Sequence, residues 1–277
     1  MNNLTSTLII TTYNWIDALR LTLDSVKRQS HLPDEVIIAD DGSRPDTTEF
    51  IRSYAKTFPT RLVHIWGEDM GFRKSIMVNK AFQIASGEYI LNTDGDIILH
   101  PRCVEDHLHW ACRGVYVRGS RSFLDENRSG QIFSGLMDPA AIPPFSGSNP
   151  LNAVRIPLLS KLVSHKSDDI DNIKGCNMAF FREDVLKING YDNTLVGWGH
   201  EEKDLSFRLH NAGLKMRKVK FEALVFHLHH KFLSRDNADA NRAKAFESLR
   251  NGTVRTPSGI AEVDSLENAP RVIFEKD

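Results

Sequence analysis

The first hundred residues alternate short apolar runs with segments in which apolar residues recur at helical spacing. The runs that predict strands are residues 7–10, 35–39, 62–65 and 88–91. The segments that predict helices are residues 16–29, about 46–57 and about 74–85. Because parallel strands need crossover connections, this alternation is typical of a largely parallel, doubly wound α/β sheet.

Polar clusters follow three of these predicted strands, at residues 11–14, 40–43 and 92–96. In a doubly wound sheet, ligands bind outside the carboxyl ends of the strands. We therefore expect the three clusters to form one site if their strands are neighbours.

The third cluster contains Asp94 and Asp96, separated by one glycine. Two carboxylates at this spacing can converge on one divalent cation, and Mg²⁺ or Mn²⁺ takes such oxygen ligands together with substrate phosphates. A surface turn is the alternative, since Asp and Gly are turn formers. The position directly after a buried strand favours the metal site.

The second cluster, at residues 40–43, places Asp41 where a carboxylate can accept hydrogen bonds from a base or a ribose. The alternative is a helix cap formed by Ser43, Asp46 or Thr47. Neither a dinucleotide-binding glycine motif nor a P-loop is present in the sequence. A nucleotide would therefore be held by carboxylates and a metal, with Arg73 either reaching it or lying solvated at a helix start.

The most unusual string is GWGHEEKD, at residues 197–204. Trp198 between two glycines offers a flat apolar face for stacking on a sugar ring, or alternatively packs in the core. The acids after it open a predicted helix over residues 201–214 and supply either a general base or favourable charge at the helix start. Further on, a predicted strand over residues 223–226 leads into His227, His229 and His230, which are either transition-metal ligands or structural.

The remaining chain is less regular. Residues 121–172 contain five prolines among Ser, Gly and Asn, which predicts a lid, a binding loop or disorder. A polar helix is expected over residues 237–250.

Composition narrows the class of protein. The formal net charge is −1, from 35 Lys and Arg against 36 Asp and Glu, which disfavours nucleic acid as a partner. Three cysteines without C-x-x-C spacing fit a reducing compartment, and the N-terminus has no cationic run typical of a signal peptide. We expect a cytoplasmic protein whose membrane association, if any, is peripheral on the inner face.

Six strings, in the right order, resemble a known family. ITTYN, ADDGS, GFR with Asn79 and Ala81, and TDGD are similar to the nucleotide-binding half of family 2 glycosyltransferases with the GT-A fold. GCNMAF and GWGHEE resemble the galactosyltransferase-like C-terminal segment of some members, and the likeness covers about residues 5–260. It implies a GT-A domain over residues 1–232, with a nucleotide-binding half (about 1–100) and an acceptor and catalytic half (101–232). A C-terminal helical extension and tail would follow over residues 233–277.

The resemblance also implies roles for individual residues. Thr11, Tyr13 and Asp41 would contact uracil and ribose, with Arg73 near the base or phosphates. Asp94 would lie near the ribose or metal. Asp96 would bind the metal with His227, for which His230 is the alternate. Glu202 would be the catalytic base, Glu201 would contact a sugar hydroxyl, and Trp198 would stack on donor or acceptor sugar.

The activity that follows is metal-dependent transfer of a hexose, such as galactose or N-acetylgalactosamine, from a UDP-sugar. The acceptor would be a hydroxyl of a glycan or lipid-linked saccharide, with inversion, in surface polysaccharide or lipopolysaccharide synthesis. The family often has Asp where this chain has Glu202, which shifts the reach of the carboxylate by one methylene, and Lys203 replaces what is commonly a third acid. A nucleotidyltransferase and a non-catalytic sugar-binding module are the alternatives.

Overall fold

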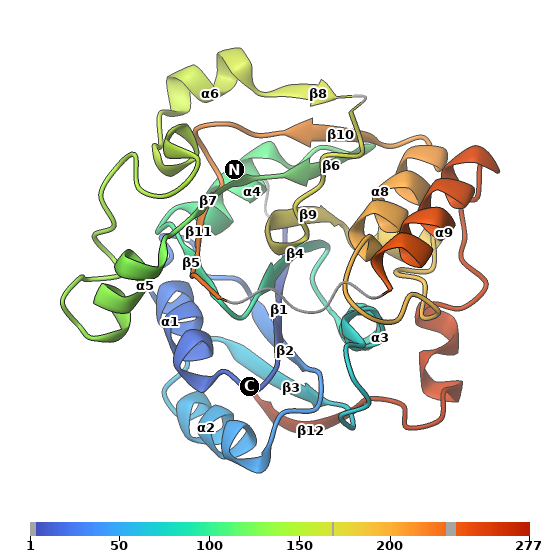
Figure 1. The fold of residues 1–277 in the computed structure, drawn as a ribbon, viewed down its shortest axis with the longest axis horizontal. Helices are drawn as coiled ribbons and strands as arrows, with labels where there is room; N and C mark the ends of the chain where they lie inside the picture. Colours follow the sequence, from blue (N-terminus) through green and yellow to red (C-terminus); the bar gives the residue numbers. More distant parts are fainter. Residues whose placement is uncertain (1–3, 168, 231–236) are drawn as a thin grey trace.

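The computed structural model describes residues 4–167, 169–230 and 237–277 and arranges them as a mixed α/β fold (Figure 1). The strands are β1 (Ser6–Thr12), β2 (Glu35–Asp40), β3 (Arg61–Trp66), β4 (Tyr89–Asp94), β5 (Ile97–Leu99), β6 (Val115–Arg118), β7 (Ser120–Phe123), β8 (His165–Ser167), β9 (Met178–Phe181), β10 (Lys215–Lys218), β11 (Leu224–His227) and β12 (Arg271–Lys276). The α-helices are α1 (Ile16–Lys27), α2 (Pro45–Ala55), α3 (Lys74–Ile84), α4 (Cys103–Trp110), α5 (Glu126–Phe133), α6 (Pro157–Val163), α7 (Arg182–Lys187), α8 (Glu201–Asn211) and α9 (Ala238–Arg250).

The larger sheet has the strand order β12-β3-β2-β1-β4-β9-β6-β10-β8. Its β3-β2-β1-β4 block is parallel, which confirms the doubly wound pattern predicted for the first hundred residues. β9 pairs antiparallel with both β4 and β6 and so joins the two halves of the sheet. The carboxyl ends of β1, β2 and β4 consequently lie side by side, as expected from the polar clusters that follow them.

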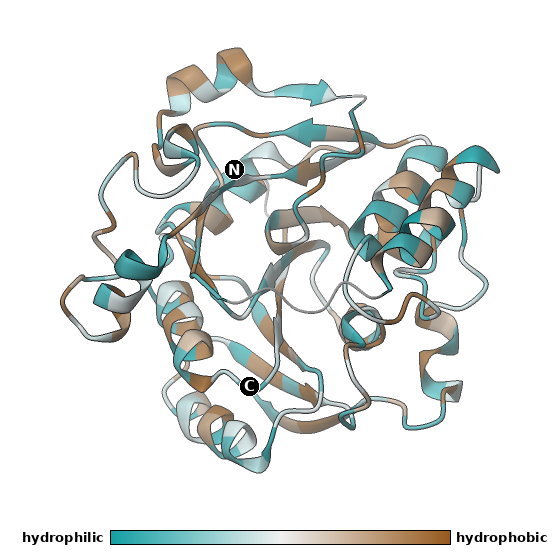
Figure 2. Ribbon diagram, in the orientation of Figure 1, coloured by the Kyte–Doolittle hydropathy of each residue, from teal (hydrophilic) through white to brown (hydrophobic). Residues whose placement is uncertain are grey.

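Helices cover both faces of the parallel block because its strands are apolar on both sides. Leu8 and Ile10 of β1 share a core cluster with α1, α2 and α4, whereas Ile9 shares another with α3, α8 and α9. Figure 2 shows the apolar residues concentrated on the central strands, while α9 is largely hydrophilic. Figure 1 shows α1 and α2 on the opposite side of the sheet from α3, α8 and α9.

A second sheet of three strands, in the order β5-β11-β7, corrects the expectation of a single sheet. β11 pairs antiparallel with β5 and parallel with β7. In this register His227 lies opposite Ile97, the residue that follows Asp96. The small sheet thus brings His227 next to the turn after β4 that contains Asp96.

The C-terminal segment is not purely helical. α9 packs on α8 as a helix, but β12 then returns to the large sheet and pairs antiparallel with β3. Residues 121–172, expected to lack regular structure, include α5 and α6 and a 3₁₀ turn at Pro150–Ala153. No helix in the described part of the chain is long and apolar enough to cross a membrane.

Candidate active site

Asp94 ends β4 within a network of charged side chains. Its Oδ1 accepts hydrogen bonds from Thr11 Oγ1 at 3.0 Å and from Lys74 Nζ at 2.8 Å. The same ammonium donates to Glu202 Oε1 at 2.9 Å. Burial alone would lower the pKa of Lys74, but the two carboxylates outweigh it and raise that pKa well above its usual value. Lys74 is therefore a charged bridge between the end of β4 and the start of α8.

Asp41 lies nearly buried where β2 ends. One carboxylate oxygen, Oδ2, accepts the backbone N–H of Arg73 at 2.7 Å, and the other, Oδ1, has no hydrogen-bond partner. Burial raises the pKa of Asp41 to about 7, although the Arg73 N–H and guanidinium act in the opposite direction. A buried acceptor without a partner costs free energy and is suited to receive a donor from a ligand.

The loops around Asp41 are held close together. A Cβ on Gly42, whose φ is +92°, would lie 2.5 Å from Asp69 Cα, so only glycine allows this approach. Asp69 accepts a hydrogen bond from the Tyr13 hydroxyl at 2.8 Å, and the Tyr13 side chain is half exposed. The Arg73 guanidinium donates to the Glu68 carbonyl at 2.9 Å. Tyr13, Asp41 and Arg73 thus border the same edge of the sheet.

The helix cap considered as the alternative role for Ser43, Asp46 or Thr47 is not present at α2. The helix begins at Pro45 with Arg44 as its N-cap and has no side-chain cap hydrogen bond. The Ser43 hydroxyl instead accepts the backbone N–H of Asn14 at 2.8 Å, which ties the loop after β1 to the loop after β2.

Asp96, His227 and His230 form a cluster whose candidate ligand atoms all lie within 4.8 Å of one another. The Nε2 atoms of His227 and His230 lie 3.7 Å and 3.5 Å from the two carboxylate oxygens of Asp96. Nδ1 of His227 lies 2.9 Å from the Leu228 carbonyl oxygen, which can only accept a hydrogen bond. The proton of the neutral ring is therefore assigned to Nδ1, and the lone pair of Nε2 is left to bind a cation.

The chemistry of this cluster fits a divalent cation. Burial raises the pKa of Asp96 even though both histidines oppose that shift, and its buried Oδ1 receives no hydrogen bond. A bound cation would compensate this poorly solvated carboxylate. The sequence suggested that Asp94 and Asp96 could both bind the cation. In the structure Asp94 accepts a hydrogen bond from Lys74, and only Asp96 belongs to the cluster. His227 and His230 are both within reach, so the geometry does not select one of them.

Glu201 and Glu202 open α8. Glu201 is buried, its Oε2 accepts the Gly199 N–H at 2.9 Å, and burial together with Glu202 raises its pKa. A Cβ on Gly175 would lie 2.1 Å from Glu202 Oε1, so a side chain at residue 175 would displace the Glu202 carboxylate. Trp198 is half-buried in the turn before the helix. That turn ends at His200, whose φ of 70° is left-handed.

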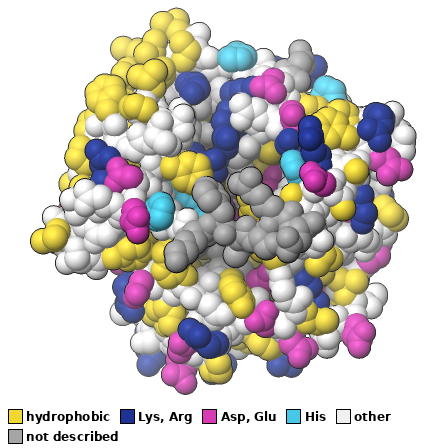
Figure 3. Space-filling model, viewed as in Figure 1, with side chains coloured by type: hydrophobic (Ala, Val, Ile, Leu, Met, Phe, Trp, Pro, Cys, Tyr) yellow, Lys and Arg dark blue, Asp and Glu magenta, His cyan; other side chains and the backbone are white. Residues whose placement is uncertain are grey.

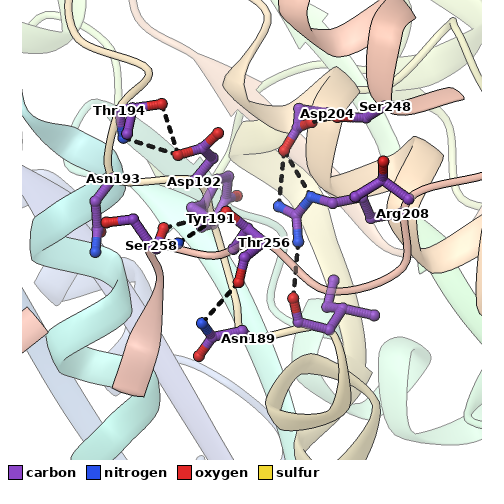
Figure 4. Close-up of polar contacts among 12 residues, drawn as sticks. Asn189, Tyr191, Asp192, Asn193, Thr194, Asp204, Arg208, Ser248, Thr256 and Ser258 are labelled. Carbon is purple, nitrogen blue, oxygen red and sulfur yellow. Dashed lines mark hydrogen bonds and ion pairs between the residues drawn. The ribbon is translucent and has the colours of Figure 1, made fainter. Parts of the chain in front are cut away.

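A buried polar network holds α8 in place (Figure 4). Arg208 donates to Asp204 Oδ2 from Nε at 2.8 Å and to the Ile188 carbonyl at 2.9 Å. The Ser248 hydroxyl of α9 donates to the other Asp204 oxygen at 2.7 Å. On the neighbouring loop, Asn189 donates to the Thr256 carbonyl at 3.0 Å. The C-terminal segment therefore anchors the helix that begins with Glu201 and Glu202.

Lys74 is the residue that sequence reasoning missed at this site. It follows the GFR string directly, but nothing in the local pattern shows that it meets a carboxylate 128 positions away. His229, weighed as a ligand in the sequence, lies outside the metal-ligand cluster of the described residues.

Comparisons with known proteins concern the family and the fold of the chain. Residues 7–144 match the model of glycosyl transferase family 2, and residues 161–231 match that of the N-terminal domain of galactosyltransferase. A solved structure titled GalNAc-T7 with UDP, GalNAc and Mn²⁺ is similar in fold, with a TM-score of 0.65 and 17% identity over 89% of this chain and 48% of that one.

Two curated relatives are similar in sequence. A validoxylamine A glucosyltransferase of Streptomyces hygroscopicus subsp. limoneus is 25% identical over 75% of this chain and 48% of its own length. A chondroitin synthase of Escherichia coli is 23% identical over 79% of this chain and 34% of its own length. The chain thus spans about half or less of the length of these relatives.

Proposed function

The chain belongs to glycosyl transferase family 2 with a GT-A fold, and from this premise we propose that it transfers a hexose from a UDP-sugar to a hydroxyl of a saccharide acceptor. The observation that carries the proposal is the Lys74 bridge, which joins the carboxylate at the end of β4 to the candidate base at the start of α8. Galactose or N-acetylgalactosamine is the proposed hexose, since the GalNAc-T7 structure holds UDP and GalNAc and the C-terminal segment matches a galactosyltransferase domain.

Asp96, His227 and His230 are the proposed ligands of a divalent cation. When bound, the cation would neutralise charge on the diphosphate of the donor. A ligand set of two imidazoles and one carboxylate suits Mn²⁺ better than Mg²⁺, which prefers oxygen ligands. The Mn²⁺ in the GalNAc-T7 structure supports the same choice.

The donor nucleotide is proposed to bind at the edge formed by β1, β2 and β4. The unpartnered Oδ1 of Asp41 can accept the N–H of uracil, while Tyr13 and Thr11 contact the base and ribose. Arg73 lies beside Asp41 and favours its ionised form. Asp94 is available to the ribose or sugar through its second oxygen, because Oδ1 is occupied by Thr11 and Lys74.

The proposed reaction is direct displacement at the anomeric carbon, with inversion. The acceptor oxygen forms a bond to this carbon as the bond to the β-phosphate oxygen of UDP breaks, and Glu202 takes the acceptor proton. Lys74 orients the Glu202 carboxylate, Glu201 contacts a sugar hydroxyl, and Trp198 stacks on a sugar ring. The proposed acceptor is a glycan or lipid-linked saccharide in surface polysaccharide or lipopolysaccharide synthesis, at the inner face of the membrane.

A thermal-shift screen of nucleotide sugars with Mn²⁺ tests the proposal, because a ligand that binds only the native state raises its stability. We expect UDP-hexoses to raise the melting temperature and GDP-hexoses to have no effect. Release of UDP from the selected donor then measures turnover. Stabilisation by a nucleoside triphosphate, with release of pyrophosphate, would replace the proposal by the nucleotidyltransferase alternative. Binding without any turnover would favour the sugar-binding module.

A further inference from the structure

A cavity of about 360 Å³ is lined by residues between positions 118 and 220, none of which belongs to the proposed uracil site. Five cationic and three amide side chains line it, and we call it the basic pocket: Arg118, Arg121, Asn149, Asn152, Asn172, Lys174, Lys218 and Lys220. Arg118 and Lys218 end the neighbouring strands β6 and β10 and stand opposite each other in register. Figure 3 shows Lys and Arg side chains gathered in the upper central part of this face.

Acids balance only part of the positive charge of the basic pocket among the residues that the structure describes. Lys218 is paired with Asp169 at 2.5 Å. Among the residues that the structure describes, no carboxylate forms an ion pair with Arg118, Arg121, Lys174 or Lys220. Burial, together with the neighbouring cations, lowers the pKa of Arg118, Lys174 and Lys220. Crowded cations of this kind are stabilised by an anion bound between them.

The basic pocket adjoins the proposed catalytic groups. Lys174 directly precedes Gly175, whose backbone lies against Glu202. Arg121 donates to Cys176 Sγ at 3.5 Å on the same short turn.

A second connection leads to the proposed metal ligands. The Arg121 guanidinium lies over the Phe123 ring at 4.1 Å, and this ring packs against His227 with centroids 4.6 Å apart. The basic pocket is thus connected through Lys174 to the candidate base and through Arg121 to a proposed metal ligand.

We propose that the basic pocket binds an anionic group of the acceptor saccharide and so selects acidic acceptors; this rests on the proposed function. Guanidinium forks match carboxylate and phosphate oxygens, and the three amides can bind sugar hydroxyls. The donor diphosphate is not the occupant, because its proposed site lies at the β1, β2 and β4 edge with Asp96. The anion has two sources, a uronic acid carboxylate of a glycan and the phosphate of a lipid-linked saccharide.

Direct binding tests the pocket without requiring turnover. Isothermal calorimetry would compare methyl glucuronide, its neutral match methyl glucoside, and inorganic phosphate. We expect methyl glucuronide or phosphate to bind and methyl glucoside not to bind. Tighter binding of methyl glucuronide assigns a glycan carboxylate, and tighter binding of phosphate assigns a lipid-linked phosphate. Failure of both anions to bind, or equal binding of the neutral sugar, would overturn the proposal.

Two variants with the same loss of charge locate the site. The Lys174→Gln/Lys220→Gln protein should bind the anion at least about tenfold more weakly, because it loses two charged hydrogen-bond donors. The Lys161→Gln/Lys166→Gln protein loses two exposed lysines outside the pocket and should bind as the wild type does. Equal weakening in both proteins would show a general effect of charge and contradict the proposal.

Turnover separates this inference from the proposed function. With the donor found in the screen, the acidic acceptor should show a lower KM than its neutral match, and the pocket variant should remove that difference while keeping its Kd for UDP. Equal use of both acceptors by the wild type would refute the inference alone. Absence of hydrolysis or transfer with every UDP-sugar would refute the proposed function, and the calorimetric result on the pocket would still decide the inference.

Discussion

The strand edge and the basic pocket present opposite charges on either side of one short turn. The edge carries Asp41, Asp94, Asp96 and, from α8, Glu202, whereas the pocket carries five Lys and Arg side chains. Both are proposed to hold anionic ligands, but in different ways. The edge needs a cation between its carboxylates and the diphosphate, while the pocket provides its own positive charge. The net charge of −1 hides this division, because it sums the Lys, Arg, Asp and Glu residues of the whole chain.

The largest effect is expected from Glu202→Gln, which removes the proposed base from the acidic side. Transfer should fall by about 10²–10⁴-fold, the usual contribution of a positioned general base, while the Kd for UDP stays unchanged. UDP release and calorimetry measure the two quantities. The control is Glu247→Gln, an exposed glutamate on α9, which should transfer sugar normally. Near wild-type transfer by Glu202→Gln would remove this residue from the mechanism.

The second largest effect is expected from Arg208→Met, which removes one partner of the buried ion pair that anchors α8. Asp204 would be left buried with an uncompensated charge, and the free energy of unfolding should fall by about 3–5 kcal/mol. Denaturant unfolding measures this change. Arg250→Met, at an exposed position at the end of α9, should leave stability almost unchanged. Equal stability of the two variants would show that the pair does not hold the helix.

Lys74→Met removes the cation that joins Asp94 and Glu202. Because a hydrogen bond to a charged group contributes about 1.5–3 kcal/mol, we expect kcat to fall by about ten- to a hundredfold. Lys74→Arg keeps the charge and should recover part of the loss. If kcat stays at the wild-type value in Lys74→Met, the bridge has no part in positioning the base.

The smallest effect is a pH dependence at Asp41. Its pKa of about 7 means that the carboxylate is protonated at lower pH and ionised at higher pH, and only the ionised oxygen accepts the uracil N–H fully. The affinity for uridine should therefore rise as pH increases through about 7, and one pH unit below this pKa it should be about tenfold weaker than at high pH. Uridine lacks phosphates and so avoids the metal site. Titrations at pH 5.5–8 should give a flat profile for Asp41→Asn, and a flat wild-type profile would contradict the assignment.

Local patterns in the sequence predicted the first half of the fold well. The strands and helices of the first hundred residues were confirmed to within a few residues, because each buries apolar side chains at its own period. β5 was missed because three residues, Ile97–Leu99, carry no periodicity. β12 was missed because it is a half-exposed edge strand far in sequence from its partner β3.

The site was predictable in part. The polar clusters after β1, β2 and β4 follow from strand order, so Thr11, Asp41 and Asp94 were expected at one edge. Lys74 could not be assigned, since its role depends on packing between α3 and α8. The basic pocket was equally hidden, because its side chains come from turns and strand ends spread over about a hundred residues, and only the fold brings them together.

The most direct test of the account is a calorimetric titration of UDP with and without Mn²⁺, on the wild type and on Asp96→Asn. The wild type should bind UDP far more tightly with Mn²⁺, and Asp96→Asn should lose this gain, by about a hundredfold or more, since loss of even an outer partner of a metal ligand costs about 10–100-fold. Asp239→Asn, which changes an exposed residue on α9, should keep the gain in UDP affinity with Mn²⁺. Full metal-dependent binding of UDP by Asp96→Asn would contradict the proposed metal site and the account built on it.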